Sequence, residues 1–535
     1  MKISKNQLTI YGPIILALVL IAGILIGNML GNNNNKSFVY SHPGKLTKIT
    51  NYIKNNYVDS VSDNKLAESA IPAMLKELDP HSVYIPAKQL QRVSEPLEGN
   101  FDGIGIQFNM TKDTVIVVST ISGGPSEMVG IQPGDRIVKV NDSVVAGVDM
   151  PSSEIVSMLK GKRGTKVNVS IKRNGNPDLL KFTITRDKIP LYSVDISYMI
   201  NDNTGYIKIN RFAKTTHKEF VQGVEKLKKQ GVQKIILDLR NNNGGYMTAA
   251  TNIVDHFLKD GKLIVYTEGR NSPKQETYAS ARGMAHDLGV AILIDEWSAS
   301  ASEIIAGAIQ DNDRGIIVGR RSFGKGLVQE QSIMPDGSAI RLTVARYYTP
   351  TGRCIQKPYK DGREQYYNDL NKRFKHGEFF HADSIDFADS LKYTTPKGDI
   401  VYGGGGIMPD YFVPVDTTDH SEFLSKIRSQ GLMYQFAFNY ADNNRSILKE
   451  FDKVEDLVLY LEEHNIYKQF LNYVEEEGIS TDARGVQKSK NLILTRVKAN
   501  IARNIQDNEG YYPVIKNIDN TLLKAAELLS EGHTS

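Results

Sequence analysis

Five stretches of the chain differ in the spacing of their apolar residues. An apolar segment dominates residues 1–36, and residues 37–96 carry apolar side chains at helical intervals. Residues 97–187 consist of short β-rich runs between glycine turns. In residues 188–417, continuous apolar runs alternate with helical stretches, and residues 418–535 are helical nearly to the end. These patterns predict a β-rich module and an α/β core between two helical regions.

In the predicted α/β core, four apolar runs suit strands that are buried on both faces, at 235–237, 263–265, 290–294 and 316–318. Helices are expected between and after them, at 216–229, 248–258 and 301–310. The β-rich module contains five short runs and one helix, at 104–108, 115–118, 137–140, 152–159, 167–171 and 180–184. Such short runs leave little room for a catalytic cavity, so a binding role is the simpler expectation for this module.

The N-terminal segment has the length of a membrane span. Residues 6–35 carry no charge, and the 23 residues of 8–30 are mostly apolar, enough for a helix to cross a hydrocarbon layer of roughly 30 Å. A cleaved signal peptide is the alternative, but no small-x-small cleavage site follows. Lys2 and Lys5 favour a cytoplasmic N-terminus. We therefore expect a single-span anchor with the remaining chain outside the cytoplasm.

Composition excludes several classes of function. The 535 residues include 65 basic and 61 acidic side chains, and this near balance argues against a nucleic-acid binder. Cys354 is the only cysteine, so neither an intramolecular disulfide nor a thiolate metal cluster can form. A His-Glu-x-x-His zinc motif is also missing from the sequence. We expect a protein without a metal or other cofactor.

Three serines occur in Trp-Ser-Ala-Ser-Ala-Ser-Glu-Ile-Ile, at 297–305, between an expected strand and an expected helix. A small side chain at such a turn is exposed at the sheet edge, and free amides at the helix N-terminus can bind an anion. An acyl-transfer enzyme needs its nucleophile and oxyanion donors in this arrangement. Alternatively, Ser300 and Glu303 form a capping box, in which the serine only satisfies a helix amide. The segment by itself leaves both interpretations open.

A lysine between two glycines occurs in Ser-Phe-Gly-Lys-Gly-Leu-Val-Gln, at 322–329. Most lysines are solvated surface charges, but Lys325 follows a buried run and can enter a site. A neutral lysine can activate a serine, and burial lowers a lysine's pKa. A phosphate-binding loop is the alternative, because Gly319, Gly324 and Lys325 match most of that pattern. Gly326 argues against it, because Mg²⁺ binding requires Ser or Thr at that position.

A glycine pair ends Leu-Asp-Leu-Arg-Asn-Asn-Asn-Gly-Gly, at 237–245. Glycines allow backbone amides to approach a ligand closely, so Gly244 and Gly245 are candidate oxyanion donors, and an ordinary strand-ending turn is the alternative. Histidine could instead supply the base. However, His217, His256 and His286 lie in polar or helical contexts without a partner pattern.

In combination, these segments resemble the carboxy-terminal processing peptidases, also called tail-specific proteases. Seven segments match in the family's order: Leu-Asp-Pro-His-Ser-Val-Tyr-Ile at 78–85, the segments 237–245, 298–304 and 323–329, Asp-Gly-Ser at 336–338, Leu-Thr-Val-Ala-Arg-Tyr-Tyr-Thr-Pro at 342–350 and Gly-Ile-Met-Pro-Asp at 406–410. The resemblance implies a crotonase-like α/β peptidase core with an inserted PDZ domain. It also implies an ATP-independent serine endopeptidase that cleaves unstructured C-terminal tails of extracytoplasmic proteins.

The resemblance also assigns roles to individual residues. It makes Ser300 the nucleophile, Lys325 the general base and Gln329 the group that orients this lysine. The amide of Ala301 and one amide of the Gly244–Gly245 pair would form the oxyanion hole. In the PDZ segment, the loop that would hold a peptide's terminal carboxylate consists of Gly103, Ile104, Gly105 and Ile106. Substrates would therefore be proteins with free, unstructured, apolar C-termini.

Two departures from the family pattern concern Asn243, where proline is usual, and an insertion of about fifty residues near 358–402. The helical extension can serve homodimerisation or adaptor docking in relatives. In a bacterium, the predicted anchor would lie in the inner (cytoplasmic) membrane with the catalytic domain in the periplasm. The rival hypothesis is a non-catalytic, membrane-anchored PDZ scaffold on a degenerate peptidase core, which requires Ser300, Lys325 and Gln329 to be idle.

Overall fold

The computed structural model describes residues 17–23, 44–111, 113–385 and 389–533, which form two compact units, 1–71 and 72–535. Of the expected membrane segment at 8–30, residues 17–23 are helical and the rest lie outside the described residues. Within the described ranges, no helix combines the length and the apolar character needed to cross a membrane. The first unit contains α2 (Lys45–Asn56) and the beginning of α3 (Asp63–Lys76).

The centre of the second unit is a six-stranded sheet, in which all neighbouring strands except the first pair are parallel. Its order is β10 (Val194–Met199), β11 (Thr204–Ile209), β12 (Lys234–Asp238), β15 (Gly289–Ile294), β16 (Ile316–Gly319) and β21 (Tyr411–Phe412). The apolar runs predicted at 235–237, 290–294 and 316–318 form three of these strands and are buried. Continuous runs suit these positions because helices cover both faces of the sheet.

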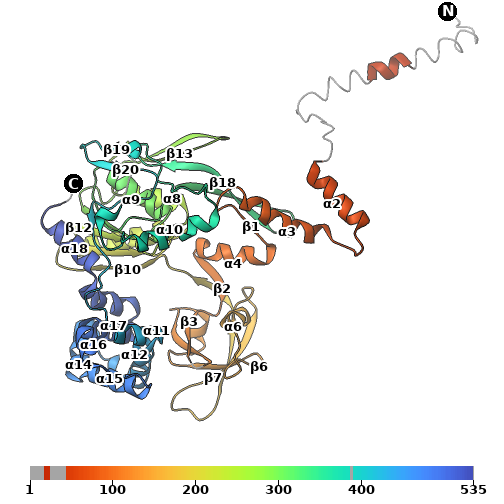
Figure 1. The fold of residues 1–535 in the computed structure, drawn as a ribbon. Coiled ribbons are helices and arrows are strands. Elements are labelled where there is room, and N and C mark those ends of the chain that lie inside the picture. The colour runs from red at the N-terminus through yellow and green to blue at the C-terminus, as the bar shows by residue number, and fades with distance from the viewer. Residues whose placement is uncertain (1–16, 24–43, 112, 386–388, 534–535) are drawn as a thin grey trace, which may run out of the picture. The chain divides into compact units, whose positions relative to one another are not determined.

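The two faces of this sheet are covered by helices from different parts of the chain (Figure 1). On one face, Ile235, Leu237 and Ile292 share a core with α7 (Thr216–Lys229), α8 (Met247–Asp255) and α9 (Ala301–Asp311). On the other face, Ile236 and Leu293 pack with apolar residues of α18 (Asn520–Ser530). Helix α18 therefore completes the core around this sheet.

A second sheet is antiparallel and contains β1 (Val83–Ile85), β18 (Ala339–Tyr348), β13 (Leu263–Gly269), β14 (Ser272–Tyr278) and β17 (Leu327–Ile333). The strand predicted at 263–265 is present, but β13 belongs to this sheet and not to the central one, because it pairs antiparallel with β14 and β18. Ile264 and Val265 are buried, as an apolar run predicts. Three apolar residues are too few to show which sheet a strand joins, because that depends on its distant partners. α4 (Ala87–Glu98) follows β1.

The β-rich module contains a six-stranded antiparallel sheet at the predicted runs. Its elements are β3 (Ile106–Thr111), β4 (Thr114–Thr120), α5 (Pro125–Met128), β5 (Arg136–Val140), β6 (Ser143–Val144), α6 (Ser152–Leu159), β7 (Lys166–Lys172) and β8 (Leu180–Thr185). β3 is an edge strand, because β4 is its only partner within the described residues. β2 (Asn100–Gly103) and β9 (Asp187–Pro190) pair where the chain enters and leaves the module, as expected for an inserted PDZ domain.

The insertion at 358–402 folds into α10 (Arg363–Lys375), the 3₁₀ turns η1 (Ala382–Ser384) and η2 (Asp389–Leu391), and a hairpin of β19 (Lys392–Thr394) and β20 (Ile400–Tyr402). Beyond 418 the predicted helices are present, and α11 to α17 surround a separate apolar core. They are α11 (Glu422–Ser429), α12 (Leu432–Asn443), α13 (Arg445–Leu448), α14 (Val454–Glu463), α15 (Ile466–Glu476), α16 (Ala483–Lys488) and α17 (Lys490–Ile515), followed by η3 (Lys516–Ile518).

Candidate active site

Ser300 lies at the turn between the central strand β15 and helix α9. Its backbone has φ 56° and ψ −112°, a conformation that a residue with a side chain rarely adopts and that costs about 1–3 kcal/mol. Ala301 is the first residue of α9, so the positive end of the helix dipole lies directly after Ser300. Strain of this kind persists where the surrounding structure holds a side chain in one required direction.

The two neighbouring serines have structural partners. The Ser298 hydroxyl is fully buried and donates to the carbonyl of Leu239 at 2.9 Å. The Ser302 hydroxyl is also fully buried and donates to the carbonyl of Asn242 at 2.9 Å. Ser300 is half-buried and lines a cavity. The geometry therefore favours Ser300 over the other two as a nucleophile.

Lys325 lies in the loop before β17, and its side chain enters the same cavity. Its Nζ donates to Oε1 of Gln329 at 3.1 Å, and Nε2 of Gln329 donates to the carbonyl of His81 at 2.6 Å. The amide of Gln329 is thus fixed at both ends. Gln329 therefore holds the amine of Lys325 in one position at the cavity wall.

The surroundings of Lys325 favour the neutral amine that a general base requires. Burial is the main reason that the pKa of Lys325 is lowered, and the positive charge of Arg341 lowers it further. Glu303 and Asp79 oppose these two effects with their negative charges. The net direction is downwards, so a larger fraction of this lysine is neutral near pH 8 than of an exposed lysine.

Glu303 connects the loop of the serine with the loop of the lysine. Its fully buried carboxylate accepts from the amides of Ser300 at 2.8 Å, Gly324 at 2.7 Å and Lys325 at 2.9 Å, and from the hydroxyl of Ser322. Sequence reasoning recognised only the capping-box contact with Ser300. The other three contacts come from a loop about twenty residues later, and no local pattern indicates them.

The glycine pair packs directly against the serine turn. A Cβ atom on Gly244 would lie 2.7 Å from the carbonyl oxygen of Ala299 and 2.8 Å from Cβ of Ser300. The Gly244 amide donates to the side chain of Asn242 at 2.9 Å, so it is not available to a ligand. In the described part of the chain, the amides of Gly245 and Ala301 have no hydrogen-bond acceptor. These two amides are therefore the oxyanion donors that the geometry offers.

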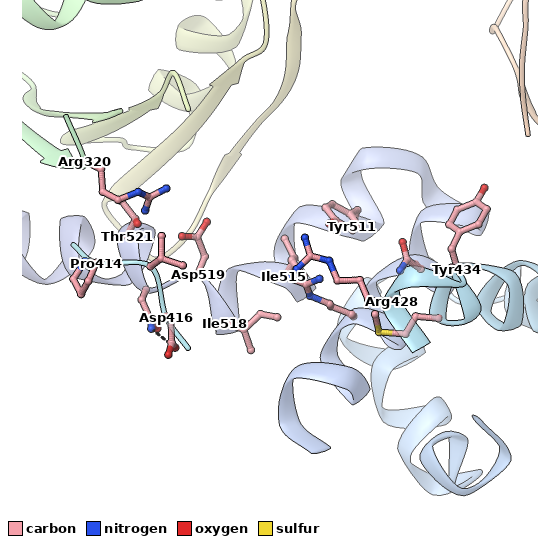
Figure 2. A pocket seen from close by; sticks show the side chains of 16 residues that line it. Arg320, Pro414, Asp416, Arg428, Tyr434, Tyr511, Ile515, Ile518, Asp519 and Thr521 are labelled. Atoms are coloured by element: carbon pink, nitrogen blue, oxygen red, sulfur yellow. Dashed lines mark hydrogen bonds between the residues drawn. The ribbon is translucent and has the colours of Figure 1, made fainter. Parts of the chain in front are cut away.

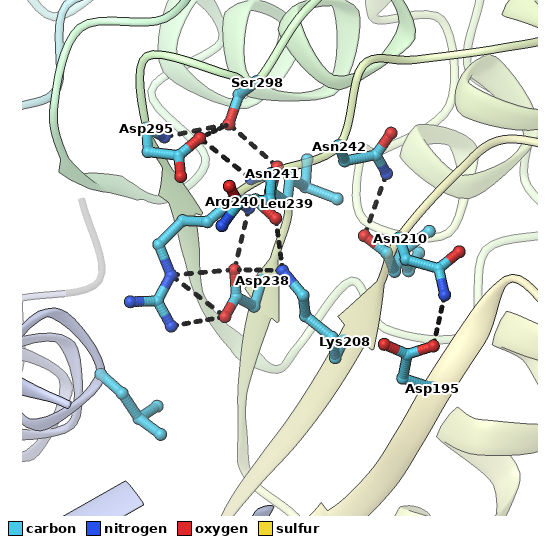
Figure 3. Close-up of polar contacts among 12 residues, drawn as sticks. Asp195, Lys208, Asn210, Asp238, Leu239, Arg240, Asn241, Asn242, Asp295 and Ser298 are labelled. Atoms are coloured by element: carbon cyan, nitrogen blue, oxygen red, sulfur yellow. Dashed lines mark hydrogen bonds and ion pairs between the residues drawn. The ribbon is translucent and has the colours of Figure 1, made fainter. Parts of the chain in front are cut away.

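A polar network holds the segment 237–245 in place (Figure 3). Asp238 is buried and accepts from Nζ of Lys208 at 3.1 Å and from Nε of Arg240 at 3.0 Å. Asp295, at the end of β15, accepts from the amide of Asn241 at 3.0 Å. The charged partners lower the pKa of Asp238 despite its burial. This network fixes the end of β12 against the end of β15, where the serine turn begins.

Five sequence-predicted residues line one cavity of about 540 Å³: Ser300, Lys325, Gln329, Gly244 and Gly245. Side chains of α4 and β18, including Leu97 and Arg341, form other parts of its wall. His217, His256 and His286 are not among the residues that line it. Instead, Nε2 of His217 and Nε2 of His256 lie 2.9 Å apart, with their rings stacked. The cavity therefore combines a serine with a lysine and not with one of these histidines.

His81 contacts Gln329, and sequence reasoning did not predict this contact. Its carbonyl accepts from Gln329, and its Nε2 lies 2.8 Å from the hydroxyl of Tyr366. Burial, with the nearby charge of Lys325, lowers the pKa of His81 to about 3, so the ring is neutral at ordinary pH. The motif at 78–85 was visible in the sequence, but the contact between residues 81 and 329 depends on the pairing of β1 with β18.

The predicted carboxylate-binding loop lies at the start of the edge strand β3. Gly103 ends β2, Ile104 is buried, and Gly105 has φ 74°. A Cβ atom on Gly105 would lie 3.0 Å from Cδ1 of Ile189. The carbonyls of Ile104 and Gly105 accept from the amides of Ser126 and Ile121, which fixes the path of the loop beside the open edge of β3.

A different cavity, of about 570 Å³, lies where the core meets the C-terminal helices (Figure 2). Its lining includes Arg320, Asp416, Arg428 and Tyr511, and Arg320 pairs with Glu296 at 2.8 Å. None of the sequence-predicted site residues lines this cavity. It therefore lies apart from the candidate chemistry.

Four family models match parts of the chain. Peptidase family S41 matches residues 203–362, and the PDZ domain matches residues 103–184. A model described as the activating protease CtpB N-terminal domain matches residues 28–89, and a family of unknown function (DUF8443) matches residues 423–507. The peptidase match includes Ser300, Lys325 and both glycines of the candidate site.

Curated relatives cover most of the chain. It is 34% identical to the carboxy-terminal processing protease CtpA of Bacillus subtilis (strain 168), over 70% of this chain and 82% of the relative. It is 34% identical to CtpB of the same organism, over 66% of this chain and 72% of the relative. A probable CtpA-like serine protease of Staphylococcus epidermidis is 35% identical, over 66% and 71% of the two chains.

Proposed function

Because this chain belongs to peptidase family S41 and is a serine-type carboxy-terminal processing peptidase with a PDZ domain, we propose that Ser300 and Lys325 are its catalytic dyad. The observation that carries this proposal is the shared cavity in which Gln329 orients Lys325 while Glu303 holds the backbone of both dyad residues. Lys325, lowered in pKa by burial, is suited to accept a proton.

In the proposed reaction, the neutral amine of Lys325 takes the proton from the Ser300 hydroxyl as Oγ attacks the carbonyl carbon of the scissile peptide bond. The resulting oxyanion accepts hydrogen bonds from the amides of Gly245 and Ala301. Protonated Lys325 then gives its proton to the leaving amine, and the peptide bond breaks. Water, deprotonated by the same lysine, hydrolyses the acyl ester and restores Ser300. None of these reaction steps requires a nucleotide or a metal ion.

The proposed substrates are extracytoplasmic proteins with unstructured, apolar C-terminal tails. The glycine loop at 103–106 presents backbone amides beside the open edge of β3, which suits a terminal carboxylate followed by strand addition. We further propose that residues 8–30 anchor the protein in the inner membrane of a bacterium with the peptidase in the periplasm. The evidence for this location is the uncharged, apolar N-terminal segment that follows Lys2 and Lys5.

Covalent labelling tests the dyad against the scaffold hypothesis. Purified chain is treated with a fluorophosphonate probe, and the modified peptide is located by mass spectrometry. We expect modification at Ser300, no modification in Ser300→Ala, and retained modification in the control Ser302→Ala. A catalytically idle scaffold would leave Ser300 unmodified and cleave no tail.

The location has its own test. A reporter fused to the C-terminus should be active outside the cytoplasm, and N-terminal sequencing of the mature protein should find residues 1–35. A mature N-terminus between residues 28 and 40 would show that the segment is a cleaved signal peptide.

A further inference from the structure

A second cavity, of about 400 Å³, adjoins the catalytic cleft, and we call it the insertion pocket. Lys325 and Asn243 line both cavities. The other residues around the insertion pocket are His81, Trp297, Ala299, Phe323, Tyr367, Leu370 and Asn371. The two cavities meet at the proposed general base. When a peptide lies in the cleft with its scissile bond at Ser300, the side chain of a residue near that bond can therefore reach the insertion pocket.

One wall of the insertion pocket comes from α10, the main helix of the insertion. This helix is tied to the loop that carries Lys325. Arg373 donates to the carbonyl of Ser322 at 3.0 Å and to that of Arg321 at 2.7 Å. Tyr367, on the same helix, donates to the carbonyl of Pro80 at 3.1 Å, which ties α10 also to the segment before β1. The wall is therefore fixed relative to the proposed base, as a pocket that discriminates between side chains requires.

Lys357 connects α10 with Phe323, an aromatic residue of the pocket lining. Nζ of Lys357 pairs with Asp369 at 2.9 Å and lies 3.9 Å from the ring centre of Phe323. The charge of Lys357 is thus balanced by Asp369 and the aromatic ring, and this lysine is not among the pocket-lining residues. Neither Lys357 nor Asp369 therefore adds a charge to the pocket lining.

Apart from Lys325, the side chains of the lining are uncharged and largely apolar. Trp297, Phe323 and Leu370 supply apolar surface, and Trp297 is about half exposed (47%), at the open side. Asn243 and Asn371 supply uncharged amides. None of the lining residues is a carboxylate or an arginine. A cationic substrate side chain would lose hydration here without gaining a partner, and an anionic one could pair only with Lys325, which must stay neutral to act as the proposed base. A large apolar or aromatic side chain would bury its surface.

We propose that the insertion pocket binds a large apolar or aromatic side chain of the substrate, at one position within about two residues of the cleaved bond. The inference rests on the proposed function, because it assumes that Ser300 attacks a bound peptide. It gives the insertion a role in choosing the cleavage position, separate from recognition of the free C-terminus. Asn243 and the insertion, the two departures noted in the sequence, both contribute to this pocket.

The test uses the full chain and a synthetic library of unstructured peptides with a fixed apolar C-terminal residue and randomised interior positions. Mass spectrometry identifies the cleaved bonds. We expect Phe, Tyr, Leu or Met to exceed Ala and Asp by about tenfold in kcat/KM at one position beside the cleaved bond. In Leu370→Trp the new ring fills the pocket, so the ratio of kcat/KM between Phe-containing and Ala-containing peptides should fall to about threefold or less.

Two further variants complete the test, one as an alternative to Leu370→Trp and one as a control. Asn371→Trp narrows the same pocket from an exposed position, so it serves if Leu370→Trp does not fold. Lys372→Ala changes an exposed neighbour on α10 that does not line the pocket, and it should keep the wild-type preference. A library profile without enrichment beside the cleaved bond, or an enrichment that both tryptophan variants retain, overturns the assignment of the insertion pocket.

Fluorophosphonate labelling in the same preparations separates this inference from the proposed function. If Ser300 is modified but the library shows no preference that the tryptophan variants remove, only the pocket assignment fails. If Ser300 is not modified and no peptide is cleaved, the proposed dyad itself is wrong.

Discussion

The carboxylate of Glu303, which is fully buried, accepts a hydrogen bond at 2.9 Å from the backbone amide of the partly buried Lys325. The same carboxylate accepts from the amide of Ser300. One buried side chain therefore sets the spacing between the turn of the proposed nucleophile and the loop of the proposed base. Glu303 acts through these backbones and is a positioning residue.

We expect Glu303→Gln to lower kcat by about 10²-fold, because a displacement of roughly 1 Å in a catalytic group has effects of that size. An amide offers one acceptor oxygen and an NH₂ group to a site that presents four donors. KM for tails should change little, since the PDZ loop is untouched. Steady-state kinetics measure both, with Glu330→Gln on the exposed side of β17 as the control. A change in KM alone would contradict a positioning role.

Activity should rise with pH through the folded-state pKa of Lys325, because only the neutral amine accepts the serine proton. The positive charge of Arg341 lowers that pKa, so Arg341→Gln should raise it and move the rising limb to higher pH. The pH dependence of kcat/KM measures this shift. Arg346→Gln, on the same strand, does not affect Lys325 and should leave the limb in place. A rise in kcat/KM near pH 6.5 that a histidine substitution abolishes would contradict the assignment of Lys325 as the general base.

His81 makes part of the stability depend on pH. Its folded pKa is about 3, below the ordinary value of 6.5, so between these values the unfolded chain binds a proton that the folded chain does not. Stability from this group is complete above pH 6.5 and is lost as pH falls towards 3, by up to about 1.4 kcal/mol per unit. Denaturant unfolding at pH 7 and pH 5 should show a larger loss for wild type than for His81→Gln. An equal loss in both proteins would show that His81 titrates normally in the fold.

The left-handed backbone of Gly244, with φ 95°, leaves no room for a side chain beside Ser300. Gly244→Ala places a methyl group against Ala299 and Ser300, so we expect a loss of activity of about 10²-fold or more with a smaller loss of stability. Gly231→Ala is the matched control, because Gly231 has φ 83° and its missing side chain would meet open space. Hydrolysis assays combined with thermal unfolding separate the two effects. Full activity in Gly244→Ala would show that the Gly244–Gly245 pair is not part of the active site.

Amidating a substrate's C-terminus should weaken capture by about tenfold or more, because charge-assisted hydrogen bonds are worth roughly 1.5–3 kcal/mol each. Gly105→Val should have a similar effect, since Gly105 has φ 74° and little space beside Ile189. Cleavage rates of matched free-acid and amidated peptides measure it, and Gly123→Val, at φ 69° in open space, is the control. Equal rates for the two peptides would mean that the module does not read the free carboxylate.

Local sequence patterns were sufficient to predict the strands and helices whose burial follows a regular spacing along the chain. The runs at 235–237, 290–294 and 316–318 predicted strands buried on both faces, because a strand covered on both faces must be apolar at every position. The run at 263–265 looked the same and belongs to the antiparallel sheet. Burial of three residues is a local property, whereas the choice of sheet depends on pairing with β18, eighty residues later.

The sequence by itself determined the chemistry that this protein can carry: a serine before a helix, a lysine between glycines, a glycine pair after a strand and an apolar N-terminal segment. Only the tertiary structure decided how these groups act. It engaged Ser298 and Ser302 in hydrogen bonds, occupied the Gly244 amide, and joined Gln329 to His81 across 248 residues. It also placed the insertion beside Lys325. Residue types and spacing fix local conformation and reactivity, but hydrogen-bond partners and cavity walls come from strand pairing and helix packing between distant segments.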